Sequence, residues 1–150
     1  MSARKSSSRR TRSISSASRT RRTIGRIVLG SFLAFAGLSH LTFARDEFTA
    51  QVPDFVPLSE DTTVLASGVV EITLGTALLL AKRKRTLVGW VVAAFFVAIF
   101  PGNISQFVNR VDAFGLTSDT ARGIRLVFQP VLVLWALWST GAWHAFRTRR

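Results

Sequence analysis

Six polar side chains interrupt the long apolar stretches of this sequence and are its candidates for chemistry. They comprise a carboxylate, two bases and three amides: His40, Glu71, Asn103, Gln106, Arg125 and Gln129. Groups of these types can bind a polar headgroup, relay a proton or satisfy one another. Where apolar stretches cross a membrane, an ionisable side chain inside them is costly, so each one is a candidate functional group.

Spacing along the sequence indicates which way two of these side chains point. In "SGVVEITLG", Ser67 and Gly75 lie four residues on either side of Glu71, so small residues share its helix face. Small residues allow another helix to approach closely, which predicts that Glu71 faces the interior of a bundle. His40 shares a helix face with Gly37 in the same way.

The remaining candidates lie near expected helix ends. Arg125 and Gln129 are four residues apart on one helix face, and Asn103 and Gln106 belong to "FPGNISQF", whose proline and glycine predict a helix end. Four expected helices therefore supply polar groups at a similar depth, which predicts one polar site or network. Two roles stay open. Glu71 and Arg125 could form a buried ion pair that fixes helix register, or the groups could bind a headgroup or relay a proton.

Several kinds of chemistry are excluded. The chain has no cysteine, which rules out a thiol relay, disulfides, iron–sulfur ligation and thiolate zinc sites. The two histidines, His40 and His144, fall at opposite ends of their expected helices, so they cannot ligate one haem, and one His with one Glu is too few for zinc. Since the sequence also has no phosphate loop, nucleophile elbow or triad, we predict no catalytic residue and no metal.

The elements that must position these groups follow from the composition. The chain of 150 residues is 48% hydrophobic and carries a formal charge of +12, and the two properties are segregated along it. Crossing a bilayer core of roughly 30 Å takes about 20 helical residues. We therefore predict an all-α integral membrane four-helix bundle, one domain over residues 23–150 with spans at residues 24–44, 62–81, 86–102 and 122–146.

The orientation of the bundle follows from its basic residues. Of the twenty Lys and Arg residues, nine lie in residues 4–26, four in residues 82–85 and three in residues 147–150, and four spans put all of these on one side. Basic residues favour the cytoplasmic side, so both termini are predicted to be cytoplasmic and the acidic loop at residues 45–61 external. An alternative, cleavage of residues 1–36 as a signal peptide, would leave three spans and conflicting charges.

Residues 1–22 form a separate segment. They contain eight Ser, seven Arg and no acid, with too few apolar residues to form a core. We predict a disordered cytoplasmic tail that contacts anionic lipid headgroups. A transit peptide is an alternative. No aromatic residue is interleaved with the arginines, so we expect no nucleic-acid partner.

The order of several short motifs resembles the DoxX-like family of small four-helix membrane proteins. The motifs are "AGLSHLTF", "VPDFVP", "SGVVEITLG", "KRKRTLVGW", "FPGNISQF" and "RLVFQPVLVLW", which span residues 24–140. The chain departs from the family pattern at Leu41, where an aromatic is usual, and at Gly102, where alanine is common. The resemblance implies a multi-pass protein of the bacterial inner (cytoplasmic) membrane. Some members of the family are associated with redox complexes, including thiosulfate:quinone oxidoreductase.

Three functions follow as expectations. The first is an accessory, non-catalytic subunit associated with a redox or quinone-linked complex or a homo-oligomer, with a quinone as the compatible ligand and no resident cofactor. The second is a small proton-coupled transporter that uses Glu71. The third is a role in stress tolerance through membrane organisation, in which the basic tail binds anionic lipid.

Overall fold

The computed structural model describes residues 3–112 and 118–147, and the side chains of the first helix from residue 16 onward. Within these ranges the chain is all-helical and contains no strand, which confirms the predicted class. The helices are α1 (Ala3–Leu41), α2 (Arg45–Thr49), α3 (Glu60–Leu80), α4 (Arg85–Ala98), α5 (Phe100–Val108), α6 (Asp119–Thr140) and α7 (Ala142–Arg147).

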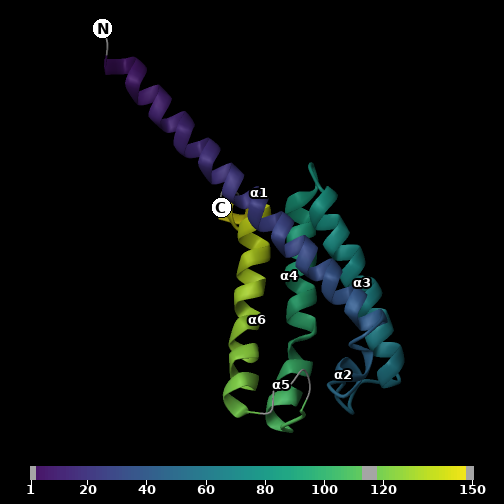
Figure 1. The fold of residues 1–150 in the computed structure, drawn as a ribbon. Coiled ribbons are helices and arrows are strands. Elements are labelled where there is room, and N and C mark those ends of the chain that lie inside the picture. Colours follow the sequence, from purple (N-terminus) through teal and green to yellow (C-terminus); the bar gives the residue numbers. More distant parts are fainter. Residues whose placement is uncertain (1–2, 113–117, 148–150) are drawn as a thin grey trace.

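Four segments of these helices are long and apolar enough to cross a membrane. They are Ser16–Leu41 of α1, all of α3, the α4 and α5 pair at Arg85–Val108, and all of α6. In the ribbon, α1, α3, α4 and α6 pack as one bundle, with both chain ends at one end and α2 and α5 at the other (Figure 1). We call these the terminal end and the distal end. The short turn between α3 and α4 lies at the terminal end.

The ends of the long helices are set by local chemistry. Ser59 and Ser118 precede α3 and α6, and each hydroxyl accepts a hydrogen bond from a backbone N–H of the first turn, which is the preferred N-cap arrangement. At the other end of α6, Gly141 adopts a left-handed conformation with φ of 76°, which costs glycine little. The predicted span at residues 122–146 is therefore two helices, because the chain turns at Gly141 before α7 begins.

Helices α1 and α3 approach each other closely along a line of glycines. A Cβ atom built on Gly75 would lie 2.6 Å from the backbone N of Ala34 and 2.6 Å from the backbone O of Gly30. Real Cβ atoms do not come this close, so only glycine permits this helix separation. The contact agrees with the expectation that the small residues around Glu71 face a neighbouring helix.

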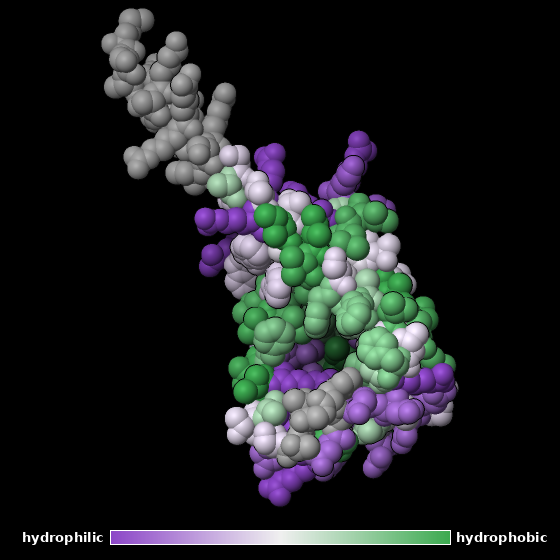
Figure 2. All heavy atoms as spheres, in the orientation of Figure 1, coloured by the Kyte–Doolittle hydropathy of each residue, from purple (hydrophilic) through white to green (hydrophobic). Residues whose placement is uncertain are grey.

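The bundle has an apolar core and an apolar exterior. Leu29, Leu33, Leu78, Val92 and Phe96 are among the buried core residues. Other large apolar side chains point outward: Val127 is 70% exposed, Phe35 61% and Leu87 60%. Hydrophobic residues cover the middle of the face in Figure 2, while hydrophilic residues gather toward its two ends. Exposed apolar area of this extent is typical of a surface that another apolar phase covers.

The structure differs from the prediction in the tail. We expected residues 1–22 to lack regular structure, but α1 is continuous from Ala3. A helix already nucleated in the apolar segment extends at low cost through arginine, alanine and lysine, which are good helix formers. The hydroxyls of Thr20 and Thr23 also donate to backbone carbonyls four residues earlier, at 3.1 and 3.0 Å.

The segment "FPGNISQF" is also helical, so the expectation that the third span ends at Gly102 was wrong. Ile99 interrupts the helix between α4 and α5, and α5 then continues to Val108. Pro101 is in the first turn of α5, where a backbone N–H has no partner within the helix, so its missing N–H costs nothing.

Candidate functional site

A cavity of about 710 Å³ lies in the distal half of the bundle, where α1 to α6 all contribute to its lining. A hollow is visible in this part of the surface in Figure 2. Its walls are mostly apolar, with side chains such as Phe32, Leu33, Phe128 and Leu132. Five of the six predicted site residues line it: His40, Glu71, Asn103, Arg125 and Gln129.

His40 and Glu71 form a buried pair between α1 and α3. The His40 Nδ1 lies 3.3 Å from the Glu71 Oε2, and each residue is 5% exposed. Neither of these two atoms has a hydrogen-bond partner among the described residues, so the contact is a close approach of two polar groups. The glycines of this interface account for the pairing, because a Cβ on Gly37 would lie 2.9 Å from the Glu71 Cβ and one on Gly68 would lie 2.9 Å from the His40 Cβ. The close approach of α1 and α3 thus brings the side chains of His40 and Glu71 together.

A chain of hydrogen bonds crosses from α5 to α4 through α6. Asn103 Nδ2 donates to Gln129 Oε1 at 3.0 Å, and Gln129 Nε2 donates to the backbone O of Phe96 at 2.7 Å. Phe96 is in the last turn of α4, where carbonyl groups lack partners within the helix. The interruption at Ile99 therefore leaves a carbonyl that the buried Gln129 side chain satisfies.

Gln106 lies behind the cavity rather than in its lining. It is 1% exposed, and its Oε1 accepts a hydrogen bond of 3.0 Å from Arg125 Nη1. Its Nε2 is buried and has no hydrogen-bond partner among the described residues. Arg125 thus connects the cavity to an amide on α5. The buried contact that the structure shows for Glu71 is with His40, whereas one of the two roles left open by the sequence paired Glu71 with Arg125.

Sequence reasoning missed the contribution of the segment between α1 and α3. Gln51 is buried against the cavity and donates from Nε2 to the backbone O of Glu47 at 2.8 Å. Phe48 lies edge-on to His40 with 3.5 Å between ring centroids. These two residues lie in or just after the five-residue helix α2, where no helical periodicity could reveal which side chains face inward.

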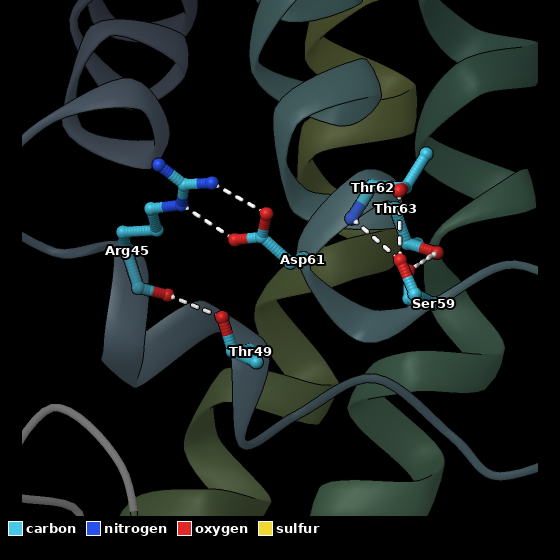
Figure 3. Close-up of polar contacts among 6 residues, drawn as sticks. All are labelled: Arg45, Thr49, Ser59, Asp61, Thr62 and Thr63. Carbon is cyan, nitrogen blue, oxygen red and sulfur yellow. Dashed lines mark hydrogen bonds and ion pairs between the residues drawn. The ribbon is translucent and has the colours of Figure 1, made fainter.

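An ion pair fixes this segment against α3. Arg45 Nε and Nη2 donate to the two carboxylate oxygens of Asp61 at 2.6 and 2.5 Å, and Thr49 Oγ1 donates to the backbone O of Arg45 (Figure 3). The hydrogen bond to Asp61 raises the pKa of the Arg45 guanidinium. The two-pronged contact restricts the orientation of α2 and so keeps Phe48 at the cavity.

The role of Arg122 was also not foreseen. It is 5% exposed, forms an ion pair with Asp112, and donates from Nη1 to Asp119 Oδ1 at 2.8 Å. The three-residue spacing from Asp119 is a signal that could have indicated this pair. Arg122 ties the end of the α5 segment to the start of α6.

The described residues do not assemble a metal site. Within residues 3–112 and 118–147, no three side chains of His, Asp or Glu come together as ligands of one ion would. Besides His40 and Glu71, the larger polar groups around the cavity are three amides and one guanidinium, which bind polar groups by hydrogen bonding. The arrangement is therefore suited to holding a headgroup.

Comparison with known proteins gives one match. The model of a family described as a domain of unknown function, DUF8561, matches residues 29–140. No curated protein and no solved structure matches the chain. The match does not address the resemblance to the DoxX-like family, which stays a prediction. Because the matched range is most of the chain and contains all six predicted site residues, the protein belongs to the DUF8561 family of domains of unknown function.

Proposed function

We propose that the protein is a multi-pass protein of the cytoplasmic membrane with both termini on the cytoplasmic side. The apolar exterior and the four apolar helices support insertion into a bilayer. Both ends of the chain and the basic turn between α3 and α4 lie at the terminal end, which the distribution of Lys and Arg assigns to the cytoplasm. The distal cavity then lies in the outer half of the membrane.

We further propose that the cavity binds the headgroup of a lipid-like ligand, as an accessory and non-catalytic subunit of a membrane redox system would. The observation that carries this proposal is the meeting of polar side chains from all four spans in one apolar-walled cavity. Binding sites for small amphiphilic molecules have this composition, with few polar groups among many apolar ones.

A quinone fits the donors that are present. Its carbonyl oxygens accept hydrogen bonds, and Arg125 and Asn103 carry N–H groups at the cavity. The apolar walls formed by Phe32, Phe128 and Leu132 suit the ring and the isoprenoid chain. A bound quinone would supply two-electron, two-proton redox chemistry, and the protein would orient the headgroup and exclude water. This ligand class is also the one that the resemblance to the DoxX-like family implies.

The first test is the binding of a short-chain ubiquinone analogue to the protein in mild detergent. Arg125→Gln should weaken binding roughly tenfold or more, because a hydrogen bond to a charged group contributes about 1.5–3 kcal/mol. Calorimetry or fluorescence quenching of the tryptophans measures the dissociation constant. Arg110→Gln is the matched control, since this exposed arginine is outside the cavity lining and should leave binding unchanged.

Two results would count against the headgroup site. One is a preparation that contains no extractable quinone or other lipid-like ligand and does not bind the analogue. The other is equal weakening of binding in Arg110→Gln and Arg125→Gln, which would indicate a general effect of charge.

Proton-coupled transport is the second candidate, and the buried His40 and Glu71 pair favours it. Two titratable groups 3.3 Å apart at a cavity are a suitable place for a proton to be taken up and released. In proteoliposomes with an imposed pH gradient, Glu71→Gln should abolish proton entry, while Glu60→Gln, at the exposed start of α3, should retain it. Proton entry through Glu71→Gln at the parent rate would disprove coupling at this residue.

A further inference from the structure

A second cavity, of about 290 Å³, lies at the terminal end of the bundle, far along the helices from the headgroup site. It is formed where α1 passes the end of α6 and the short helix α7. Its lining combines bases, indole rings and aliphatic side chains: Arg22, Leu134, Leu137, Trp138, Gly141, Trp143, His144 and Arg147. None of the described residues that line this cavity is acidic.

Arg22 is held in this cavity without a counter-charge among the lining residues. Its Nε is buried and has no hydrogen-bond partner among the described residues. Its Nη1 would lie 3.7 Å from a Cβ built on Gly141, so the left-handed glycine at the turn leaves space beside the guanidinium. Arg26, one turn along α1, contrasts with it, because its Nη1 donates to the carbonyls of Leu78 and Ala81 at the end of α3.

The other side of the cavity presents a second guanidinium on an aromatic surface. The Arg147 guanidinium lies 5.7 Å from the centre of the Trp143 ring. Trp138 and Trp143 are each about half exposed, and Leu134 is exposed beside them. Tryptophan is enriched at the boundary between a bilayer and water, and arginine binds phosphate through paired N–H groups. The cavity therefore places phosphate-binding groups next to surfaces that suit acyl chains.

We propose that this cavity binds the phosphate of an anionic membrane lipid, with the headgroup between Arg22 and Arg147 and an acyl chain along Leu134 and Trp138. The location supports a lipid over a soluble phosphate, because the exposed apolar side chains of Leu134 and Trp138 line the same cavity as the two arginines. Basic pockets between membrane helices on the cytoplasmic side suit such headgroups. This site is independent of the distal cavity and of the function proposed for it.

The test measures lipid binding to the full chain in a non-ionic detergent by native mass spectrometry. Phosphatidylglycerol should bind, and phosphatidylcholine at the same concentration should bind at least tenfold more weakly. Arg22→Gln and Arg147→Gln should each weaken phosphatidylglycerol binding about fivefold, which corresponds to about 1 kcal/mol for one basic residue near a lipid surface. Arg21→Gln is the matched control, since it removes the same charge from an exposed position of α1.

Four results would overturn the proposal, and the first three come from the lipid-binding measurements above. These three are equal weakening in Arg21→Gln and Arg22→Gln, no preference for phosphatidylglycerol over phosphatidylcholine, and full displacement of the lipid by an equal concentration of inorganic phosphate. The third would show that free phosphate is the ligand. Arg22→Lys keeps the charge but loses the planar donor pair, so a folded Arg22→Lys variant with parental affinity would also contradict the geometry.

Discussion

Replacing Gly75 with valine should prevent α1 and α3 from packing closely and should cost about 3 kcal/mol in the free energy of unfolding. A Cβ at this position would lie 2.6 Å from two backbone atoms of α1, and backbone cannot move aside as a flexible side chain can. Overpacking usually costs 1–3 kcal/mol, and a helix interface built on glycine lies at the upper end of that range. Thermal unfolding in detergent, or unfolding in sodium dodecyl sulfate, measures the change.

Gly102→Ala is the matched control for this prediction. A Cβ on Gly102 would meet only the backbone O of Gln51, at 3.8 Å, which is an ordinary contact. The control should therefore unfold close to the parental midpoint. If Gly75→Val unfolded at that midpoint too, the close approach of α1 and α3 would be wrong.

The second large effect is expected at the buried pair of His40 and Glu71. Removing one partner, as in His40→Leu or Glu71→Leu, leaves the other polar group buried beside an apolar side chain, and each change should cost about 1–3 kcal/mol. The double variant places leucine at both positions and leaves neither group behind. Its cost should be smaller than the sum of the single costs by about 1–3 kcal/mol, the coupling expected of residues in contact.

The same variants distinguish structure from function at this pair. If the pair only holds α1 against α3, the double variant should recover both stability and ligand binding. If the pair acts on a ligand or a proton, stability should recover while binding or proton entry stays lost. Additive costs in the double-mutant cycle would show that the two side chains do not interact.

Much of the fold was predictable because apolar length and charge placement are properties of the sequence itself. The number of apolar helices and the turn between α3 and α4 followed from them directly. The inward face of Glu71 also followed, because Ser67 and Gly75 mark the side on which another helix packs. The five cavity residues could be grouped by depth, because each lies at a known distance along the sequence from the end of an expected helix.

The sequence did not allow us to predict which polar side chains of the site contact one another. Whether Glu71 meets His40 or Arg125 depends on the rotation of each helix about its axis, and sequence spacing gives only the face of one helix at a time. Because α1 and α3 approach closely, Glu71 contacts His40. Gln51 was missed because it follows a five-residue helix in a segment with two prolines. Such a segment is too short to show a helical periodicity that would indicate which side chains face inward.

The hydrogen bonds from Asn103 to Gln129 and from Gln129 to the Phe96 carbonyl have a mechanical consequence. They restrain the break at Ile99, because the Gln129 side chain of α6 is hydrogen-bonded to α4 on one side of the joint between α4 and α5 and to α5 on the other. Asn103 is also at the cavity, so a headgroup that accepted from the particular N–H now donated to Gln129 would release Gln129 on one side and leave the joint free to bend. The tilt of α5 at the distal end would then differ between the filled and the empty cavity.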